Sequence, residues 1–263
     1  MLRLAPAGVA MFVVVAFCIP SYLSWEPNSG EKVGWRCLVL AGLTLVAWAI
    51  SASRAARAWW DSRLYLRRSL ANGCETVLHD AHAPVCFTDY PGPAVALAGI
   101  IHPRAIVTRA AAAALSREQL DAALRHERAH AESRDNLKRL AMLLDPGLLP
   151  RRTAAALEQA WVRAAEWAAD DRAADGDPHR ALALAEALVR VSRLTQDVFV
   201  PRLVTALAAD NLDSRVERLL NLPVVCHPTS SVARTWWLLA GASAASLLEP
   251  SLRPVYLILE KLI

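Results

Sequence analysis

The sequence predicts an α+β domain that is mostly α-helical, contains a small sheet and is attached to transmembrane helices. Three observations predict this fold class. Uncharged segments lie near both ends of the chain, short apolar runs broken by Pro and Gly lie between residues 83 and 109, and helical patterns fill most positions from there to residue 221. The chain has 263 residues, of which 55% are hydrophobic, and this length allows one or two domains.

Charged side chains are absent from three segments of 22, 17 and 14 residues, which comprise residues 4–25, 37–53 and 235–248. A helix needs about 20 mostly apolar residues to cross a bilayer, with about 17 as the lower limit. We therefore expect a transmembrane hairpin over residues 1–53, and a C-terminal membrane segment over residues 229–263 that crosses the membrane or lies along it. The alternative for the first segment is a cleaved signal peptide, although no small-x-small cleavage site precedes Trp25.

The residues that follow the second uncharged segment are strongly basic. One acid, Asp61, stands here against five arginines, which are Arg54, Arg57, Arg63, Arg67 and Arg68. The positive-inside rule therefore predicts that the N-terminus and the domain after Arg54 are cytoplasmic, in a multi-pass protein of a bacterial-type inner membrane. Much of the net charge of +4 lies in this run, so we interpret the run as an anchor on the lipid bilayer and expect no nucleic-acid partner.

Residues 54–228 are expected to form the cytoplasmic domain. Its sequence predicts a linking helix over residues 55–80 and two or three short strands in "PVCFTDY", "AVALAG" and "RAIVTR". Ser116 and Gln119 form a capping-box pattern that opens a helix to about Leu144. Three further helices are predicted over approximately residues 153–175, 178–194 and 210–221.

The helix predicted after Ser116 contains "HERAH", which runs from His126 to His130. Residues four apart project from one face of a helix, so both imidazoles can bind one metal ion. Glu127 lies about 100° further round the helix, where it can reach a metal-bound water but is not a natural third ligand. The alternative is a solvated helix face with incidental histidines.

A catalytic zinc site needs a third protein ligand and an open position for water. No two of the five cysteines have C-x-x-C spacing, which argues against a cysteine ligand. Glu166 and Asp170 lie four apart on a predicted helix that is otherwise rich in Ala and Trp, where carboxylates are costly unless a positive charge meets them. We assign Glu166 as the third ligand and Asp170 as the acceptor that orients one histidine. The alternative is a solvated acidic face shared with Asp171 and Asp175.

The two motifs together resemble a known family. "HERAH" followed by "EWAAD" is similar to the H-E-x-x-H and E-x-x-A-D helices of membrane-embedded gluzincin metallopeptidases. The stretch "LSREQLDAALRHERAHAESRDNLKRL" resembles the active-site region of peptidases related to the BlaR/MecR beta-lactam signal transducers, and more distantly that of the HtpX and prenyl-protein endopeptidase groups. "GIIHPRAIVT" resembles the edge strand of the family, and "SRVERLL" resembles its late Arg-containing helix. The resemblance covers roughly residues 75–222.

This resemblance implies a zincin-like zinc endopeptidase whose active site faces the cytoplasm. Carried over by position, His126, His130 and Glu166 bind one Zn²⁺ per chain, and Glu127 is the general base. The candidates for stabilising the transition state are Arg215, Arg218 and His179. The BlaR/MecR proteins carry an extracellular drug-sensing domain after their last span, whereas this sequence ends at Ile263, so beta-lactam sensing is not expected.

The expected partner is a protein or peptide substrate that lies extended along an edge strand within residues 94–109. Its cleavage would serve regulatory proteolysis or membrane-protein quality control. Two other functions stay open at this point. One is a non-catalytic membrane signalling or scaffold protein that retains the metallopeptidase fold. The other is a structural zinc site in a transporter accessory protein.

Overall fold

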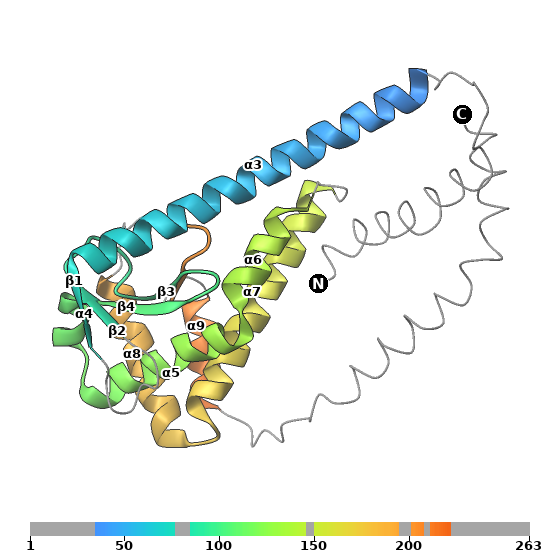
Figure 1. Cartoon of the computed structure of the whole chain (residues 1–263). Helices are drawn as coiled ribbons and strands as arrows, with labels where there is room; N and C mark the ends of the chain where they lie inside the picture. Colours follow the sequence, from blue (N-terminus) through green and yellow to red (C-terminus); the bar gives the residue numbers. More distant parts are fainter. Residues whose placement is uncertain (1–34, 77–84, 146–149, 195–200, 208–210, 222–263) are drawn as a thin grey trace, which may run out of the picture. The chain divides into compact units, whose positions relative to one another are not determined.

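The computed structural model describes five stretches of the chain, which are residues 35–76, 85–145, 150–194, 201–207 and 211–221 (Figure 1). The chain divides into two compact units, and each is described by itself. The unit formed by residues 51–144 and 152–225 contains the sheet and most of the helices. Its fold is α+β and mostly α, as predicted.

The sheet contains five strands in the order β1-β2-β4-β3-β5. β2 and β4 pair in parallel, whereas the pairs β1–β2, β3–β4 and β3–β5 are antiparallel. The strands are short, and they comprise β1 (Gly73–Thr76), β2 (Val85–Thr88), β3 (Val95–Ala98), β4 (Arg104–Thr108) and β5 (Thr205–Ala206).

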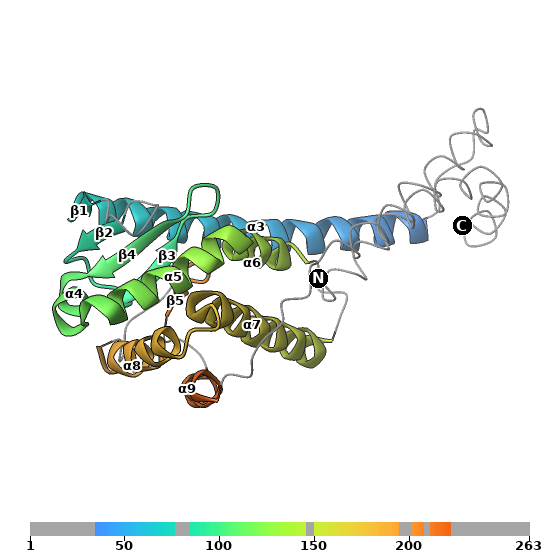
Figure 2. The same cartoon turned by 90° about the horizontal axis from the view of Figure 1, so that it is seen from below.

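Alternating side chains let the sheet bury both faces. In β4, Val107 joins a core cluster with Ala123 of α5 (Arg117–Ser133) and Leu184 of α8 (Pro178–Leu194). Its neighbour Ile106 points the other way and packs with Tyr65 of α3 (Trp35–Ala71). Figure 2 shows α3 on one side of the strands and α5 with α8 on the other. This packing fixes α5 against the sheet.

The predicted helices are present, with two corrections. The remaining helices are α4 (Arg109–Ala114), α6 (Asp135–Leu143), α7 (Arg151–Ala174) and α9 (Leu212–Leu220). The single helix expected from residue 117 to about Leu144 is two helices, because Arg134 adopts a left-handed conformation with φ 54° and separates α5 from α6. Asp135 and Asn136 are buried just after this break. Asp135 bonds back to His130, whereas the side chain of Asn136 donates to the distant carbonyl of Gly99, and these contacts outweigh local helix propensity.

The helix expected over residues 55–80 is also shorter than predicted. α3 ends at Ala71, and the edge strand β1 begins at Gly73. A Cβ atom at Gly73 would lie 2.6 Å from the carbonyl oxygen of Phe87, so the close approach of β2 requires glycine here. The dipeptide Asn72-Gly73 is the sequence signal for this turn.

The expectation of a free edge strand within residues 94–109 is wrong for the described sheet. β4 lies between β2 and β3, and β3 lies between β4 and β5. The two-residue strand β5 pairs with Ala96 and Leu97, so this chain's own segment occupies that edge. β5 is too short to give a periodic pattern, and the sequence therefore did not reveal it.

Of the predicted membrane segments, residues 4–25 and 229–263 lie outside the described residues, and residues 37–53 fall within α3. Within the residues that the structure describes, no helix is long and apolar enough to cross a bilayer. The N-terminal part of α3 nevertheless exposes large apolar side chains, which are Val39, Leu43, Leu45, Val46 and Ile50.

Candidate metal centre

Two histidines on α5 form the core of the site. The helix begins at a complete capping box, in which the Ser116 hydroxyl accepts from the Gln119 backbone N–H and the Gln119 side chain accepts from the Ser116 backbone N–H. This start sets the helical register that brings His126 and His130 to one face. Both imidazoles are fully buried, and their Nε2 atoms lie 3.0 Å apart. The histidines are therefore not part of a solvated helix face.

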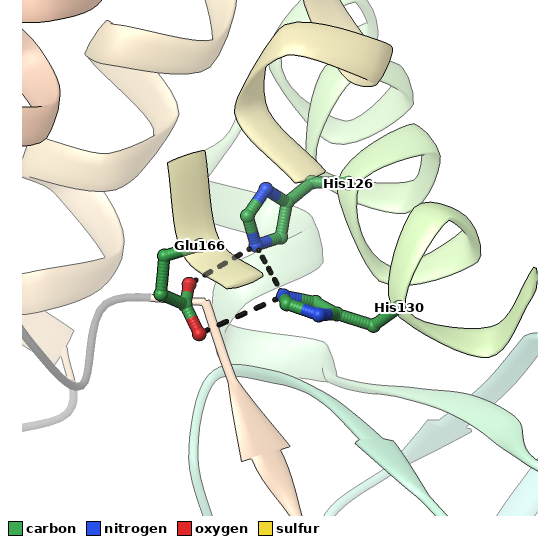
Figure 3. Close-up of side chains that lie close together, drawn as sticks. All are labelled: His126, His130 and Glu166. Atoms are coloured by element: carbon green, nitrogen blue, oxygen red, sulfur yellow. Dashed lines mark hydrogen bonds and ion pairs between the residues drawn. The ribbon is translucent and has the colours of Figure 1, made fainter. Parts of the chain in front are cut away.

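Glu166 of α7 completes a convergent group, as predicted (Figure 3). Its Oε2 lies 3.4 Å from Nε2 of His126, and its Oε1 lies 3.6 Å from Nε2 of His130. In a tetrahedral site with zinc–ligand bonds of about 2.0–2.2 Å, ligand atoms lie about 3.3–3.5 Å apart. The two carboxylate–imidazole separations lie close to this range, whereas the two Nε2 atoms are nearer to each other at 3.0 Å. The His, His and carboxylate chemistry suits a divalent metal ion such as zinc, and the buried Glu166 is not part of a solvated acidic face.

Each imidazole has its own carboxylate at Nδ1. His126 Nδ1 lies 2.9 Å from Oδ1 of Asp170, so this acid lies beside one histidine as predicted, although the two groups are not aligned as a hydrogen bond. His130 Nδ1 lies 2.7 Å from Oδ2 of Asp135, a role that the sequence reasoning did not assign. An imidazole N–H that donates to a carboxylate leaves Nε2 as the ligand atom and fixes the ring orientation. Both rings are thus presented with Nε2 toward Glu166.

Arg215 is brought to the centre, but it is held there by acidic side chains. Its guanidinium donates from Nε and Nη2 to Asp170 at 2.9 and 2.7 Å, and from Nη1 to the Leu207 carbonyl at 2.7 Å. Nη1 also lies 3.0 Å from Oε2 of Glu166. The side chain is only 1% exposed. Arg215 therefore connects Glu166 with the carboxylate that lies beside His126.

The other two candidates for transition-state stabilisation lie elsewhere. Arg218 makes a bidentate ion pair with Asp171 at 2.6 and 2.8 Å, and its guanidinium lies over the Trp167 ring. His179 is exposed in the first turn of α8, where its backbone N–H donates to the Asp177 side chain. Neither side chain is among the groups that converge on the two histidines.

Glu127 is the most unusual group of the centre. It is fully buried, and neither of its carboxylate oxygens has a hydrogen-bond partner among the described residues. Burial raises the pKa of Glu127 to about 7, because desolvation penalises the charged form. A buried carboxylate without a partner is costly to a fold, which points to a functional reason for its position.

The centre contains more acidic than basic side chains. Four buried carboxylates, those of Glu127, Asp135, Glu166 and Asp170, surround the histidines, whereas Arg215 is the one fully buried arginine or lysine among the described residues. Burial alone would lower the pKa of each histidine, but the carboxylates outweigh burial and raise both pKa values, that of His130 to about 9. The same contacts hold the pKa of Glu166 well below its ordinary value. This charge distribution favours either protons or a divalent cation on the imidazoles.

The chain matches no protein-family model and no curated protein. The resemblance to gluzincin peptidases therefore stays a prediction that rests on the two motifs.

Proposed function

We propose that this protein is a membrane-anchored zinc endopeptidase of zincin-like fold, which hydrolyses a peptide bond of a protein substrate at the cytoplasmic face in regulatory proteolysis or membrane-protein quality control. One observation carries the proposal. Two imidazoles and the carboxylate of Glu166 converge beside Glu127, which is buried without a hydrogen-bond partner among the described residues. A site that binds metal only for structural support gives no reason for this additional carboxylate.

His126, His130 and Glu166 would hold one zinc ion per chain. Bound zinc would polarise the scissile carbonyl and lower the pKa of a water molecule to about 7. Asp170 and Asp135 lie at Nδ1 of the two rings, so that both Nε2 atoms face the Glu166 carboxylate and would be available to the ion. Arg215 stabilises the buried negative charge of Glu166 and Asp170.

Glu127 would act as the general base and then as the general acid. Its carboxylate takes a proton from the attacking water and gives that proton to the nitrogen of the leaving amine. A group that does both works best when its pKa lies near the ambient pH. In the metal-free site burial raises the pKa of Glu127 to about 7, so this carboxylate takes up a proton more readily than an exposed glutamate does.

The membrane location rests on the N-terminal half of the described chain. The exposed apolar residues of α3 between Val39 and Ile50 are followed by Trp59 and Trp60, which are 39% and 59% exposed. Aromatic rings followed by a run of arginines are typical of a membrane interface on the cytoplasmic side. We infer that α3 links a membrane segment to the catalytic domain.

The direct test compares the purified full-length protein with its Glu127→Gln form. We expect near-stoichiometric zinc in both proteins and casein cleavage only in the first, because the amide cannot take up the proton. Glu132→Gln is a matched control, since Glu132 lies on the same helix but pairs with Arg128 at the surface. Cleavage that persists in Glu127→Gln would refute the mechanism. Zinc binding without any cleavage would instead support a non-catalytic scaffold.

A further inference from the structure

We propose that Arg139 is a catalytic residue of this site, whose guanidinium donates to the carbonyl oxygen of the scissile peptide and stabilises the negative charge that develops there. The inference rests on the proposed peptidase function and assigns a role that Arg215, Arg218 and His179 were expected to fill. It stands on the position of Arg139, on its unused hydrogen-bonding capacity and on its exposure.

Arg139 lies beside the third ligand. Its Nη2 is 3.8 Å from Oε1 of Glu166, the same oxygen that lies 3.6 Å from Nε2 of His130. Arg139 is also four residues after Asp135 on α6, and Asp135 holds the His130 ring. One short helix therefore positions both a support of the metal-binding histidine and a guanidinium next to the centre.

The guanidinium of Arg139 has donors to spare. Its Nε is buried and has no hydrogen-bond partner among the described residues, and its ion pair with Glu166 is long at 3.8 Å. The ring of Trp161 lies 5.8 Å from the guanidinium carbon, which restricts the orientation of the group without using any N–H. A buried donor without a partner is unfavourable, so this arrangement suits an acceptor that arrives with the substrate.

The other two arginines near α7 are engaged differently. Arg215 donates to Asp170 and to the Leu207 carbonyl, and Arg218 makes a bidentate pair with Asp171. Carboxylates satisfy these groups at short range. Among the three guanidiniums, only that of Arg139 combines proximity to the ligands with donors that lack an acceptor in the described structure.

Exposure indicates the direction from which a peptide would reach the centre. The side chains of His126, His130 and Glu166 are 0–5% exposed, whereas that of Arg139 is 19% exposed. Arg139 therefore connects the buried ligands to the surface. A peptide carbonyl that approaches along this side would meet the guanidinium before it reaches the ligand atoms.

Arg139 would act at the step in which negative charge develops on the carbonyl oxygen. The water oxygen bonds to the carbonyl carbon while its proton passes to Glu127, and the π electron pair of the carbonyl moves to the oxygen. Arg139 donates a hydrogen bond to that oxyanion and keeps its own proton. The pair then returns, the C–N bond breaks and the amine leaves with the proton from Glu127. Removal of one such donor lowers kcat by about 10²–10³-fold.

The test uses a phosphinic pseudopeptide, whose tetrahedral anionic group resembles the oxyanion. We would measure its affinity for the zinc-loaded full-length protein and for Arg139→Met, with zinc content and melting temperature in parallel. The expected result is affinity about 100-fold weaker in Arg139→Met, with unchanged zinc content and a smaller loss in Arg139→Lys. Arg128→Met is the matched control, because it removes an exposed guanidinium that pairs with Glu132, and it should bind as the unmodified protein does.

Each of the other possible results also decides whether Arg139 has this role. Equal affinity in Arg139→Met overturns the inference but leaves the proposed function intact, provided that cleavage still depends on Glu127. Loss of zinc in both Arg139 variants assigns Arg139 to charge balance at Glu166 and also overturns it. If Arg139→Met does not fold, Arg139→Lys decides, with weaker affinity expected and equal affinity contradicting the inference. A zinc-loaded protein that neither binds the pseudopeptide nor cleaves casein removes the proposed function, and the role of Arg139 with it.

Discussion

The two histidines of the centre are supported in different ways. His126 is oriented by Asp170 of α7, which is itself held by Arg215 of α9, and both partners are 1% exposed. His130 is oriented by Asp135, five residues further along the chain, and Lys138 pairs with this acid from the surface with 39% exposure. The first support joins three helices in the core, whereas the second is local and partly solvated.

This difference separates stability from metal affinity. Removing one member of a buried charge pair leaves an uncompensated charge, which is strongly destabilising. A pair with an exposed lysine contributes little, because water screens it and the side chain loses entropy. We therefore expect the Asp170 support to contribute more to fold stability than the Asp135 support does, and both supports to contribute to zinc affinity.

The largest effect should follow Asp170→Asn, which breaks the buried support. Arg215 then loses its two hydrogen bonds to a carboxylate and, of its two ion pairs, keeps only that with Glu166, and the metal-free protein should lose about 3–5 kcal/mol of unfolding free energy. Urea denaturation of the metal-free protein measures this change. Asp171→Asn is the control, since Asp171 pairs with the partly exposed Arg218 and its loss should cost about 1 kcal/mol or less. Equal losses in the two variants would contradict the distinction.

Asp135→Asn should act mainly on the metal. The amide can still face Nδ1 of His130 but cannot stabilise the ring as a carboxylate does, so zinc affinity should fall about 10–100-fold. Competition with a chelating dye measures the affinity, and urea denaturation should show a smaller loss of stability than Asp170→Asn does. A loss of stability as large as that of Asp170→Asn would show that the two supports are equivalent.

Zinc affinity should rise with pH, by up to about tenfold per pH unit for each proton displaced. Without metal, the carboxylates raise the pKa of His130 from 6.5 to about 9, so the ring is protonated at neutral pH and must lose that proton to bind zinc. The protonated ring stabilises the metal-free fold below pH 6.5, and this contribution is lost as the pH rises through about 9. Calorimetry in buffers of different ionisation enthalpy would detect proton release at pH 7.5, and its absence there would contradict the role of His130.

The smallest effect is expected for Lys138→Met at the surface end of the local support. The ion pair of Lys138 with Asp135 spans 2.8 Å but is partly exposed, so we expect a loss below about 1 kcal/mol and little change in zinc affinity. Thermal unfolding and the same dye competition would measure both quantities. A change in affinity as large as that of Asp135→Asn would place Lys138 in the metal-binding machinery.

The same division between local and long-range contacts explains what the sequence could predict. His126, His130, Glu166 and Asp170 lie at helical spacings of four, and such periodicity is visible along the chain. Arg139 carries no such signal, because its proximity to Glu166 depends on how α6 packs on α7.

Two other features could also not be predicted from the sequence. The break between α5 and α6 depends on the left-handed conformation of Arg134, which is not a residue that favours it. The strand β5 is only two residues long and forms because β3 lies beside it. Asp135 lies directly after this break, so its contact with His130 could not be predicted from the expected single helix.

The central claim is that His126, His130 and Glu166 hold one metal ion with a position open for water. Titration of the metal-free protein with Co²⁺, followed by visible absorption, tests it most directly. We predict one ion per chain with the intense absorption of a four- or five-coordinate site, lost in Glu166→Ala and kept in the α7 control Glu158→Ala. Weak octahedral absorption, or a spectrum that Glu166→Ala leaves unchanged, would contradict the account.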